Sequence, residues 1–413
     1  MKNIKSWVTW SIANAFFLYE VVLRVSPSTM TDDLMLHYGI TTSVLGITIS
    51  FFYYSYVVLQ IPCGLILDKL GPRNLIGISV ILSVFGSILF ALTDSILVAQ
   101  CGRFLVGAGA SCAFISSLQI ASTVFPARYF PIFAGITNMM GTFGALCSGF
   151  PVAKFVNVVG WQKTMLALAL AGIILAVLTF AFVPKTIRIP ENMGMQKSFT
   201  SILKKVTKNK QIILSGLVGG FMYLPVSVFS ELWAIPFFMT KHNVNNEVAS
   251  LAASSLFIGF AIGSIPIALI AKKVRSYTKT MRFSMVCTAA LFFALIYSQS
   301  MCFSFVIVFL IGIFTAAQVI IFTCARNNAS PRNSGTAIAL ANGLVMLAGS
   351  IFQPVFGILL DFFWAGKTSE SGIRLYDISC YQQAIITLPI CLVAAYVLSI
   401  FIKETINIEG SAH

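Results

Sequence analysis

Long apolar stretches separated by short polar segments dominate this chain. Twelve runs have the roughly 20–25 apolar residues that a helix needs to cross a bilayer. They cover approximately residues 7–30, 43–67, 74–93, 96–122, 129–153, 163–183, 211–239, 248–271, 280–299, 301–324, 334–360 and 381–402. The pattern predicts an all-α membrane protein with twelve transmembrane helices.

A polar stretch, Pro184–Lys210, separates the sixth run from the seventh. It predicts two six-helix halves, residues 1–183 and 211–413, joined by a cytoplasmic linker of residues 184–210. Short segments recur in the two halves at one constant separation: Phe17-Leu18-Tyr19 as Phe221-Met222-Tyr223, Leu65–Leu70 as Leu269–Val274, and Asn138 as Asn342. Parallel repeats of this kind place a substrate site between the halves at mid-membrane. The alternative is that apolar helices resemble each other by composition alone.

Composition and charge place the chain in the membrane and give it an orientation. Of its 413 residues, 58% are hydrophobic and 10% charged, whereas soluble domains carry about 25% charged residues. The net charge of +14 could suggest nucleic acid, but most Lys and Arg residues fall in alternate loops. This positive-inside bias predicts that both termini are cytoplasmic, and we expect the lipid bilayer, not nucleic acid, as the partner. The first run is expected to be an uncleaved span, because charged residues interrupt it.

The first run carries Glu20 and Arg24, each of which costs roughly 2.5–3.5 kcal/mol at the centre of an inserted helix. With Ser28 they follow i, i+4, i+8 spacing and share one helix face. That face is expected to look at protein or water. Two interpretations stay open: the pair forms one wall of a substrate site, or the two charges neutralise each other and leave only Glu231 functional.

The seventh run carries the polar stripe Tyr223, Ser227, Ser230 and Glu231, spaced i, i+4, i+7 and i+8 for an α-helix. The full set of candidate substrate-binding residues is Tyr19, Glu20, Arg24, Tyr53, Tyr56, Gln119, Asn138, Tyr223, Ser227, Glu231, Gln318 and Asn342. For the uncharged members, interhelical packing and hydrogen bonding is the plainer alternative.

The charged residues indicate the chemistry of the solute. Arg24 can hold a carboxylate through two hydrogen bonds, and Glu20 or Glu231 can hold an ammonium group, which suits a zwitterion. No histidine lies within a run, so Glu20 and Glu231 are also the candidates for carrying a proton. We find no catalytic cluster, no metal-ligand spacing and no cofactor motif, so an enzyme is not expected. A membrane sensor is disfavoured because no sizeable soluble domain is present.

Two motifs identify a family. The loop after the second run contains Gly64, Asp68, Lys69, Gly71 and Arg73, a candidate gating motif. The fourth run contains Arg103, Gly107 and Gly109. The loop resembles the Gly-x-x-x-Asp-Arg/Lys-x-Gly-Arg-Arg/Lys signature of the major facilitator superfamily, from which it departs at Pro72, and the fourth run resembles that superfamily's Arg-x-x-x-Gly-x-Gly-Ala element. Arg103 is expected either to snorkel or to modulate a nearby carboxyl.

Longer segments resemble one subfamily, the phagosomal nutrient transporters of intracellular gammaproteobacteria. They are Phe17–Ser28, Ser230–Trp233 and the stretch from Gly335 to Asp361. The resemblance implies a monomeric secondary transporter of a bacterial inner membrane, which imports a small polar nutrient, most simply an amino acid, by alternating access with H⁺. Nucleoside or organic-anion carriers and siderophore or drug exporters are the alternatives. An organic-anion exchanger would be expected to have basic residues in both halves, whereas the seventh run offers only the acid Glu231.

Overall fold

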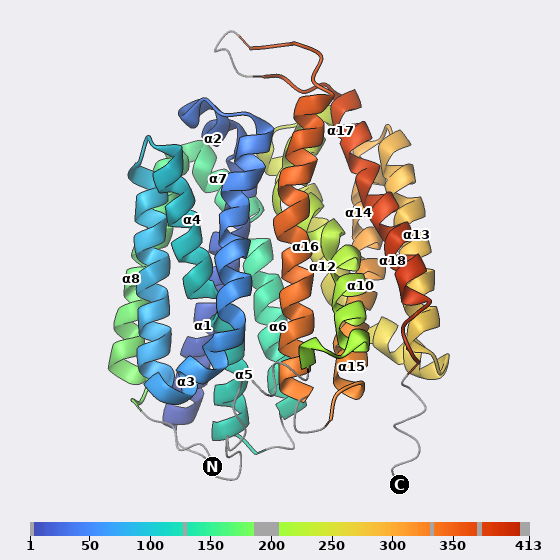
Figure 1. The fold of residues 1–413 in the computed structure, drawn as a ribbon. Helices are drawn as coiled ribbons and strands as arrows, with labels where there is room; N and C mark the ends of the chain where they lie inside the picture. The colour runs from blue at the N-terminus through green and yellow to red at the C-terminus, as the bar shows by residue number, and fades with distance from the viewer. Residues whose placement is uncertain (1–3, 127–129, 186–205, 331–333, 370–373, 405–413) are drawn as a thin grey trace. The chain divides into compact units, whose positions relative to one another are not determined.

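The computed structural model describes residues 4–126, 130–185, 206–330, 334–369 and 374–404 (Figure 1). The side chains of residues 63–70 lie outside the described part. Within the described residues, twelve helical segments are long and apolar enough to span a membrane, from Ile4–Thr29 to Ile378–Ser399. The predicted all-α fold with twelve spans is confirmed.

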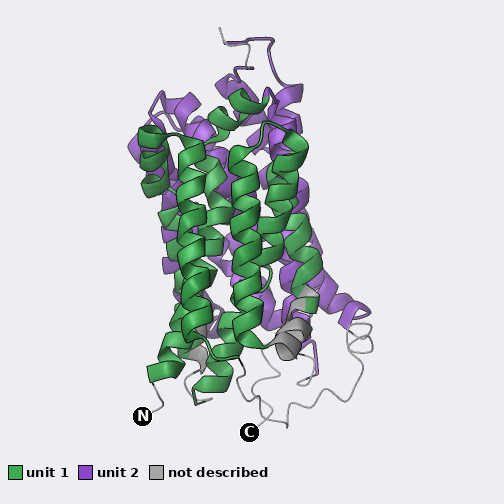
Figure 2. Cartoon of the chain, turned by 90° about the vertical axis from the view of Figure 1, so that its left-hand side faces the viewer, with its two compact units in different colours: residues 1–38, 47–194 green, residues 39–46, 195–413 purple. Residues whose placement is uncertain are grey.

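The chain divides into two compact units (Figure 2). Unit 1 comprises residues 1–38 and 47–194, and unit 2 comprises residues 39–46 and 195–413. The segment 39–46, which precedes and begins the second span, therefore belongs to unit 2. Most of the predicted linker 184–210 lies outside the described residues, so its bounds stay a prediction.

Unit 1 is built around its first helix, which packs against several others. Its elements are α1 (Ile4–Val25), the 3₁₀ turn η1 (Ser26–Thr29), α2 (Thr31–Tyr38), α3 (Thr42–Leu92, from Ile47 onward), α4 (Ile96–Ala110), α5 (Ala113–Val124), α6 (Phe130–Cys147), α7 (Phe150–Val159) and α8 (Trp161–Phe182). Helix α1 contacts α4, α5, α6 and α8. Its residues are therefore enclosed by their own unit.

Unit 2 repeats this plan with a different interruption in its first helix. Its elements are α10 (Lys210–Leu224), the π-helical segment η4 (Pro225–Trp233), α11 (Ala234–His242), α12 (Asn246–Lys273), α13 (Tyr277–Tyr297), α14 (Met301–Thr315), η5 (Ala316–Val319), α15 (Ile320–Asn327), α16 (Ser334–Phe362), α17 (Ile378–Ile385) and α18 (Thr387–Ser399). Helices α10, α12, α13 and α14 are each preceded by a residue whose side chain accepts a hydrogen bond from a first-turn amide: Asn209, Asn245, Ser276 and Ser300. These caps fix the residues at which the four helices start.

Equivalent helices pair within each unit. The first and fifth spans pack together as α1 against α6 and as α10 against α16. The second and fourth spans approach at glycine: a Cβ on Gly107 would collide with the Phe52 carbonyl, and one on Gly259 with the Phe309 carbonyl. The third and sixth spans meet where Gly77 faces the Phe180 ring in unit 1, and as α13 against α18 in unit 2. This shared pairing supports the internal repeat.

The turn between the second and third spans carries a second mark of the repeat. Gly71 has a φ of 73° in unit 1, and Arg275 has a φ of 53° in unit 2. These residues directly follow the repeated segments Leu65–Leu70 and Leu269–Val274. A positive φ suits glycine and strains other residues, so unit 1 has the unstrained version of this turn.

Candidate functional site

Glu20 is buried in the middle of α1, with 2% of its surface exposed. Its Oε1 accepts a hydrogen bond of 2.6 Å from the Ser83 hydroxyl of α3, while Oε2 is buried without a hydrogen-bond partner among the described residues. The hydrogen bond of this carboxyl therefore comes from another helix and not from Arg24. Sequence reasoning missed Ser83, although a stripe of buried serines spaced i, i+4, i+8 runs along the third span: Ser79, Ser83 and Ser87.

Arg103 of α4 is also buried, with 1% of its surface exposed, so of the two alternatives expected for it, snorkelling does not apply. Its guanidinium donates to the carbonyl oxygens of Leu23, at 2.9 Å, and Arg24, at 3.4 Å. The reason lies four residues after Leu23: Pro27 has no N–H to continue the α-helical ladder. Where α1 ends and the turn η1 begins, Arg103 supplies the shorter of two hydrogen bonds to the Leu23 carbonyl, and the Ser26 hydroxyl supplies the other at 3.5 Å.

Aromatic rings flank the Arg103 charge, and the guanidinium carbon lies 5.3 Å from the Phe52 ring centroid and 5.9 Å from that of Phe90. Cation–π attraction of this kind stabilises a desolvated cation. The Arg103 charge also acts on the Glu20 carboxyl. Glu20, Ser83 and Arg103 thus form one buried polar cluster in unit 1.

The other unit 1 candidates occupy varied surroundings. The Tyr19 hydroxyl lies against Gly172 of α8. Arg24 and Gln119 are half-buried, Tyr53 and Tyr56 are buried, and Asn138 is exposed. The structure brings Glu20 together with Arg103, two residues that the sequence had assigned to separate motifs. Whether the remaining residues contact a solute stays a prediction.

In unit 2 the first helix changes from α to π geometry over Pro225–Trp233. Short π-helical segments occur frequently at functional sites. The stripe predicted from Tyr223 to Glu231 assumed α-helical spacing, which does not apply in this segment. The two serines accordingly bond differently: Ser230 donates to the Ala253 carbonyl of α12 at 2.8 Å, and Ser227 donates to the Tyr223 carbonyl at 3.2 Å.

Gln353 of α16 forms two hydrogen bonds with the π-helical segment. Its side-chain amide donates to the Ser227 carbonyl at 2.7 Å, and its own carbonyl accepts from the Trp233 indole at 3.3 Å. The Trp233 ring stacks on Phe356 with centroids 5.5 Å apart. Glu231, 2% exposed, lies within this braced segment. Tyr223 and Asn342 are half-buried, and Gln318 is buried in η5.

The candidate gating motif is described only in part. The side chains of Gly64, Asp68 and Lys69 lie outside the described residues. Gly71 takes its positive φ beside the Lys185 carbonyl, with which a Cβ would collide, and Arg73 donates to the Phe180 carbonyl. In the fourth span, Gly109 packs against Ser79 and Ser83, so these glycines bring α4 close to α3.

No group of three or more His, Cys, Asp or Glu side chains that could hold a metal occurs in the described part of the chain.

A model of the family described as the Major Facilitator Superfamily matches residues 12–354 and 232–406. The probable galactarate/D-glucarate transporter GudP of Bacillus subtilis (strain 168) is 24% identical over 308 residues, 66% of this chain and 68% of that protein. A putative tartrate transporter of Agrobacterium vitis is 28% identical over 174 residues, 40% of this chain and only 39% of that protein.

Among solved structures, a bacterial homologue of the human lysosomal transporter Spinster has a TM-score of 0.81 at 15% identity, with 97% of both chains covered. That likeness concerns the fold. Taken with the family match over most of the chain, it agrees with the twelve spans and the paired halves. The chain belongs to the major facilitator superfamily: it is a multi-pass membrane protein of a family of transporters, not of enzymes.

Proposed function

We propose that this protein is a proton-coupled importer of a small nutrient that carries a carboxylate, most simply an amino acid. The observation that carries the proposal is the charge inventory of the two first helices. Arg24 of α1 is a cation at half-buried depth, and Glu20 and Glu231 are buried acids. A solute with an anionic and a cationic end complements that set.

Arg24 is proposed to bind the carboxylate of the solute. Its guanidinium can donate two parallel hydrogen bonds to a carboxylate, and a charge-assisted pair of this kind contributes about 1.5–3 kcal/mol. Glu231 is proposed to bind the ammonium group. The π geometry of its segment, braced by Gln353, would hold the carboxyl in a fixed place. The resemblance to the phagosomal nutrient transporters supports the amino-acid assignment.

A sugar acid or another organic anion is the second candidate. The two curated relatives described above are named as transporters of galactarate/D-glucarate and tartrate. These anions carry the carboxylate that Arg24 would bind, but they carry no ammonium group for Glu231. The two candidates therefore share one binding residue and differ in the other.

Uptake into proteoliposomes separates them. A radiolabelled panel of amino acids and sugar acids is offered to the wild type, Arg24→Ala, Glu231→Gln and the surface control Asp94→Asn. Arg24→Ala should raise KM at least about tenfold for either class, since a lost charge-assisted hydrogen bond costs about 1.5–3 kcal/mol. Glu231→Gln should abolish amino-acid uptake and spare sugar-acid uptake. Wild-type protein that transports neither class would rule the proposal out.

Glu20 is proposed to carry the proton. An isolated ionised carboxylate is very costly in an apolar interior, so its charge state can follow the arrival and departure of a proton. Glu20→Gln should abolish accumulation driven by an inward proton gradient and retain solute exchange at equal pH. Accumulation by Glu20→Gln at the wild-type level would assign the coupling to another group.

A further inference from the structure

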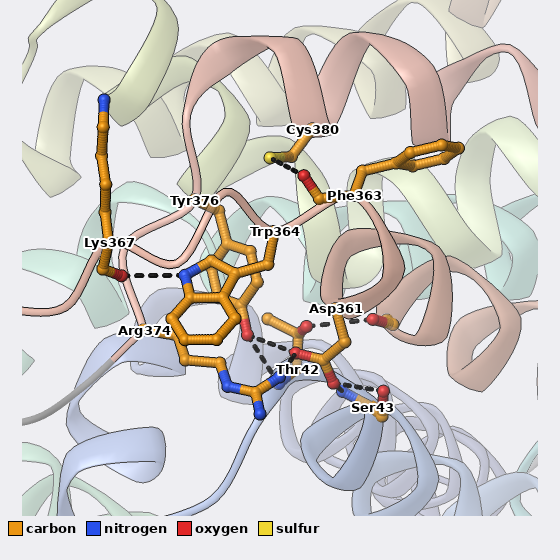
Figure 3. A network of polar contacts seen from close by, with 10 residues as sticks. Thr42, Ser43, Asp361, Phe363, Trp364, Lys367, Arg374, Tyr376 and Cys380 are labelled. Carbon is orange, nitrogen blue, oxygen red and sulfur yellow. Dashed lines mark hydrogen bonds and ion pairs between the residues drawn. The ribbon is translucent and has the colours of Figure 1, made fainter.

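The loop between α16 and α17 is organised around one carboxylate at the end of α16, Asp361 (Figure 3). Its Oδ1 accepts from the Arg374 guanidinium at 3.2 Å and from the Tyr376 hydroxyl. Its Oδ2 accepts from the backbone N–H of Ser43 at 3.0 Å and from the Ser43 hydroxyl. Only 14% of the Asp361 side chain is exposed. Both oxygens are therefore engaged, and Ser43 supplies two of these hydrogen bonds.

Ser43 lies in the first turn of α3, which begins at Thr42. First-turn amides have no partner within the helix, and the positive end of the helix dipole favours an anion. Asp361 satisfies both requirements from more than 300 residues away in sequence. The Thr42 hydroxyl adds a 3.0 Å hydrogen bond to the Gly357 carbonyl. The start of α3 is thus capped by α16 and not by its own sequence.

Two glycines let these backbones touch. A Cβ on Gly46 would lie 2.8 Å from the Gln353 carbonyl oxygen, and one on Gly357 would collide with the Thr42 carbonyl. The contact explains why residues 39–46 belong to unit 2, while α3 from Ile47 onward belongs to unit 1 (Figure 2). One continuous helix therefore passes from one unit to the other just after its capped first turn.

The rest of the loop presents Arg374 to the carboxylate. The guanidinium carbon of Arg374 lies 4.3 Å from the Trp364 ring centroid, and the Trp364 indole donates to the Lys367 carbonyl at 2.8 Å. Lys367 in turn pairs with Asp377 at 2.8 Å. This brace is local to the loop, whereas the bonds from Asp361 to Ser43 reach another span.

We propose that Asp361 is a positioning residue of the transport cycle, which holds the first turn of α3 to the end of α16 in one state and releases it in the other. The inference rests on the proposed transport function, because alternating access requires the two halves to rearrange. Such a movement must either break α3 after Gly46 or release Ser43. Water can replace the side-chain bonds at the end of a span, but it cannot replace broken backbone bonds within the bilayer.

Hydrogen exchange tests the cap without any substrate. In Asp361→Ala, the amides of residues 43–46 should exchange about tenfold faster than in the wild type, while amides of α1 keep their rates. Asp361→Asn keeps an acceptor for the Ser43 amide and should show a smaller increase. Asp377→Asn, which removes a carboxylate from the same loop, is the matched control and should change nothing at residues 43–46. Wild-type protection in Asp361→Ala would overturn the cap.

A reversible tether tests the release. Ser43→Cys and Asp361→Cys are combined in a variant whose native cysteines are replaced, and the pair is joined by oxidation or a short thiol-to-thiol reagent. Uptake by the reduced double variant, which lacks the Asp361 carboxylate, is the reference. Uptake should fall at least tenfold below that reference when the pair is joined and return to it on reduction. The control pair Trp364→Cys and Arg374→Cys, tethered within the loop, should retain uptake. Full uptake by the joined Ser43–Asp361 pair would overturn the proposal, whereas absence of uptake in the wild type would overturn only the transport function.

Discussion

At the scale of single residues, each unit supplies a side-chain donor to the backbone of a proline-interrupted first helix. In unit 1 the interruption follows from Pro27, and Arg103 donates to the Leu23 carbonyl. In unit 2 the π segment begins at Pro225, and Gln353 donates to the Ser227 carbonyl. Proline is tolerated in membrane helices where neighbouring groups satisfy the backbone. Arg103 is therefore a structural donor as well as a charge beside Glu20.

Arg103→Ala should lower the free energy of unfolding by about 1–3 kcal/mol, because it leaves the buried Leu23 carbonyl with only the long, 3.5 Å hydrogen bond from the Ser26 hydroxyl. Thermal unfolding of the purified protein in detergent measures the change. Arg103→Lys retains the charge, but a single ammonium group cannot reach both carbonyls as the two guanidinium nitrogens do. Its loss of stability should therefore be smaller than that of Arg103→Ala. Unaltered stability in Arg103→Ala would show that Leu23 finds another donor.

At the scale of helices, close approach depends on glycine at particular positions. Gly107 of α4 faces the Phe52 carbonyl and the Ser55 hydroxyl of α3 with no room for a Cβ. By contrast, nothing lies within 4 Å of a Cβ placed on Gly135 of α6. Helix contact therefore requires glycine at position 107 but not at position 135, although the sequence shows both simply as glycine in an apolar span.

Gly107→Ala should destabilise the protein by about 1–3 kcal/mol, because it forces α3 and α4 apart. Gly135→Ala, the control, should stabilise it by about 0.5–1 kcal/mol through helix propensity. Thermal unfolding of the two variants side by side measures both effects. Equal responses would mean that the α3–α4 contact relaxes without cost.

The last span is fastened to the third helix of unit 2 by Glu404. Its carboxylate accepts from the hydroxyls of Ser276, at 2.6 Å, and Thr278, at 3.0 Å, and from the backbone amides of Tyr277 and Thr278, both at 3.2 Å. Burial by itself would raise the pKa of Glu404, but these hydrogen bonds outweigh it and hold the pKa below its ordinary value of 4.5. The start of α13 is therefore capped by an anion from the end of the chain.

Because the pKa of Glu404 is lower in the folded state, its contribution to stability is present above about pH 4.5. That contribution is lost as the pH falls through the folded-state value. Unfolding temperatures measured between pH 7 and pH 3 should fall more steeply for the wild type than for Glu404→Gln. Ser276→Ala, which removes one donor, should give an intermediate slope. If the unfolding temperatures of wild type and Glu404→Gln changed equally with pH, the Glu404 carboxylate would not contribute to stability in this way.

At the scale of the whole molecule, the distribution of basic residues predicts an orientation. Lys272, Lys273 and Lys279 are exposed around the turn from α12 to α13, on the same side as the termini by the count of spans. The positive-inside rule predicts that this side is cytoplasmic. A green fluorescent protein fused to the C-terminus should fluoresce, and a periplasm-dependent phosphatase inserted after Lys367 should be active. The reverse pattern in both reporters would invert the topology.

The sequence by itself determined the twelve spans and the superfamily. These properties are local: a span in lipid must satisfy its own backbone and be apolar for about 20 residues, so each can be counted without knowing its neighbours. Gly71 is a further case, because a tight turn with a positive φ needs glycine wherever the rest of the chain lies.

Only the tertiary structure decided the partners of the polar residues. Glu20 bonds to Ser83 and not to the arginine one turn away, and Arg103 neither snorkels nor stays within its own helix. The cap of α3 comes from Asp361, far along the chain. The physical reason is the same in each case. A buried polar atom bonds to whatever group packing brings beside it, and that choice depends on which helix faces meet rather than on spacing within one helix.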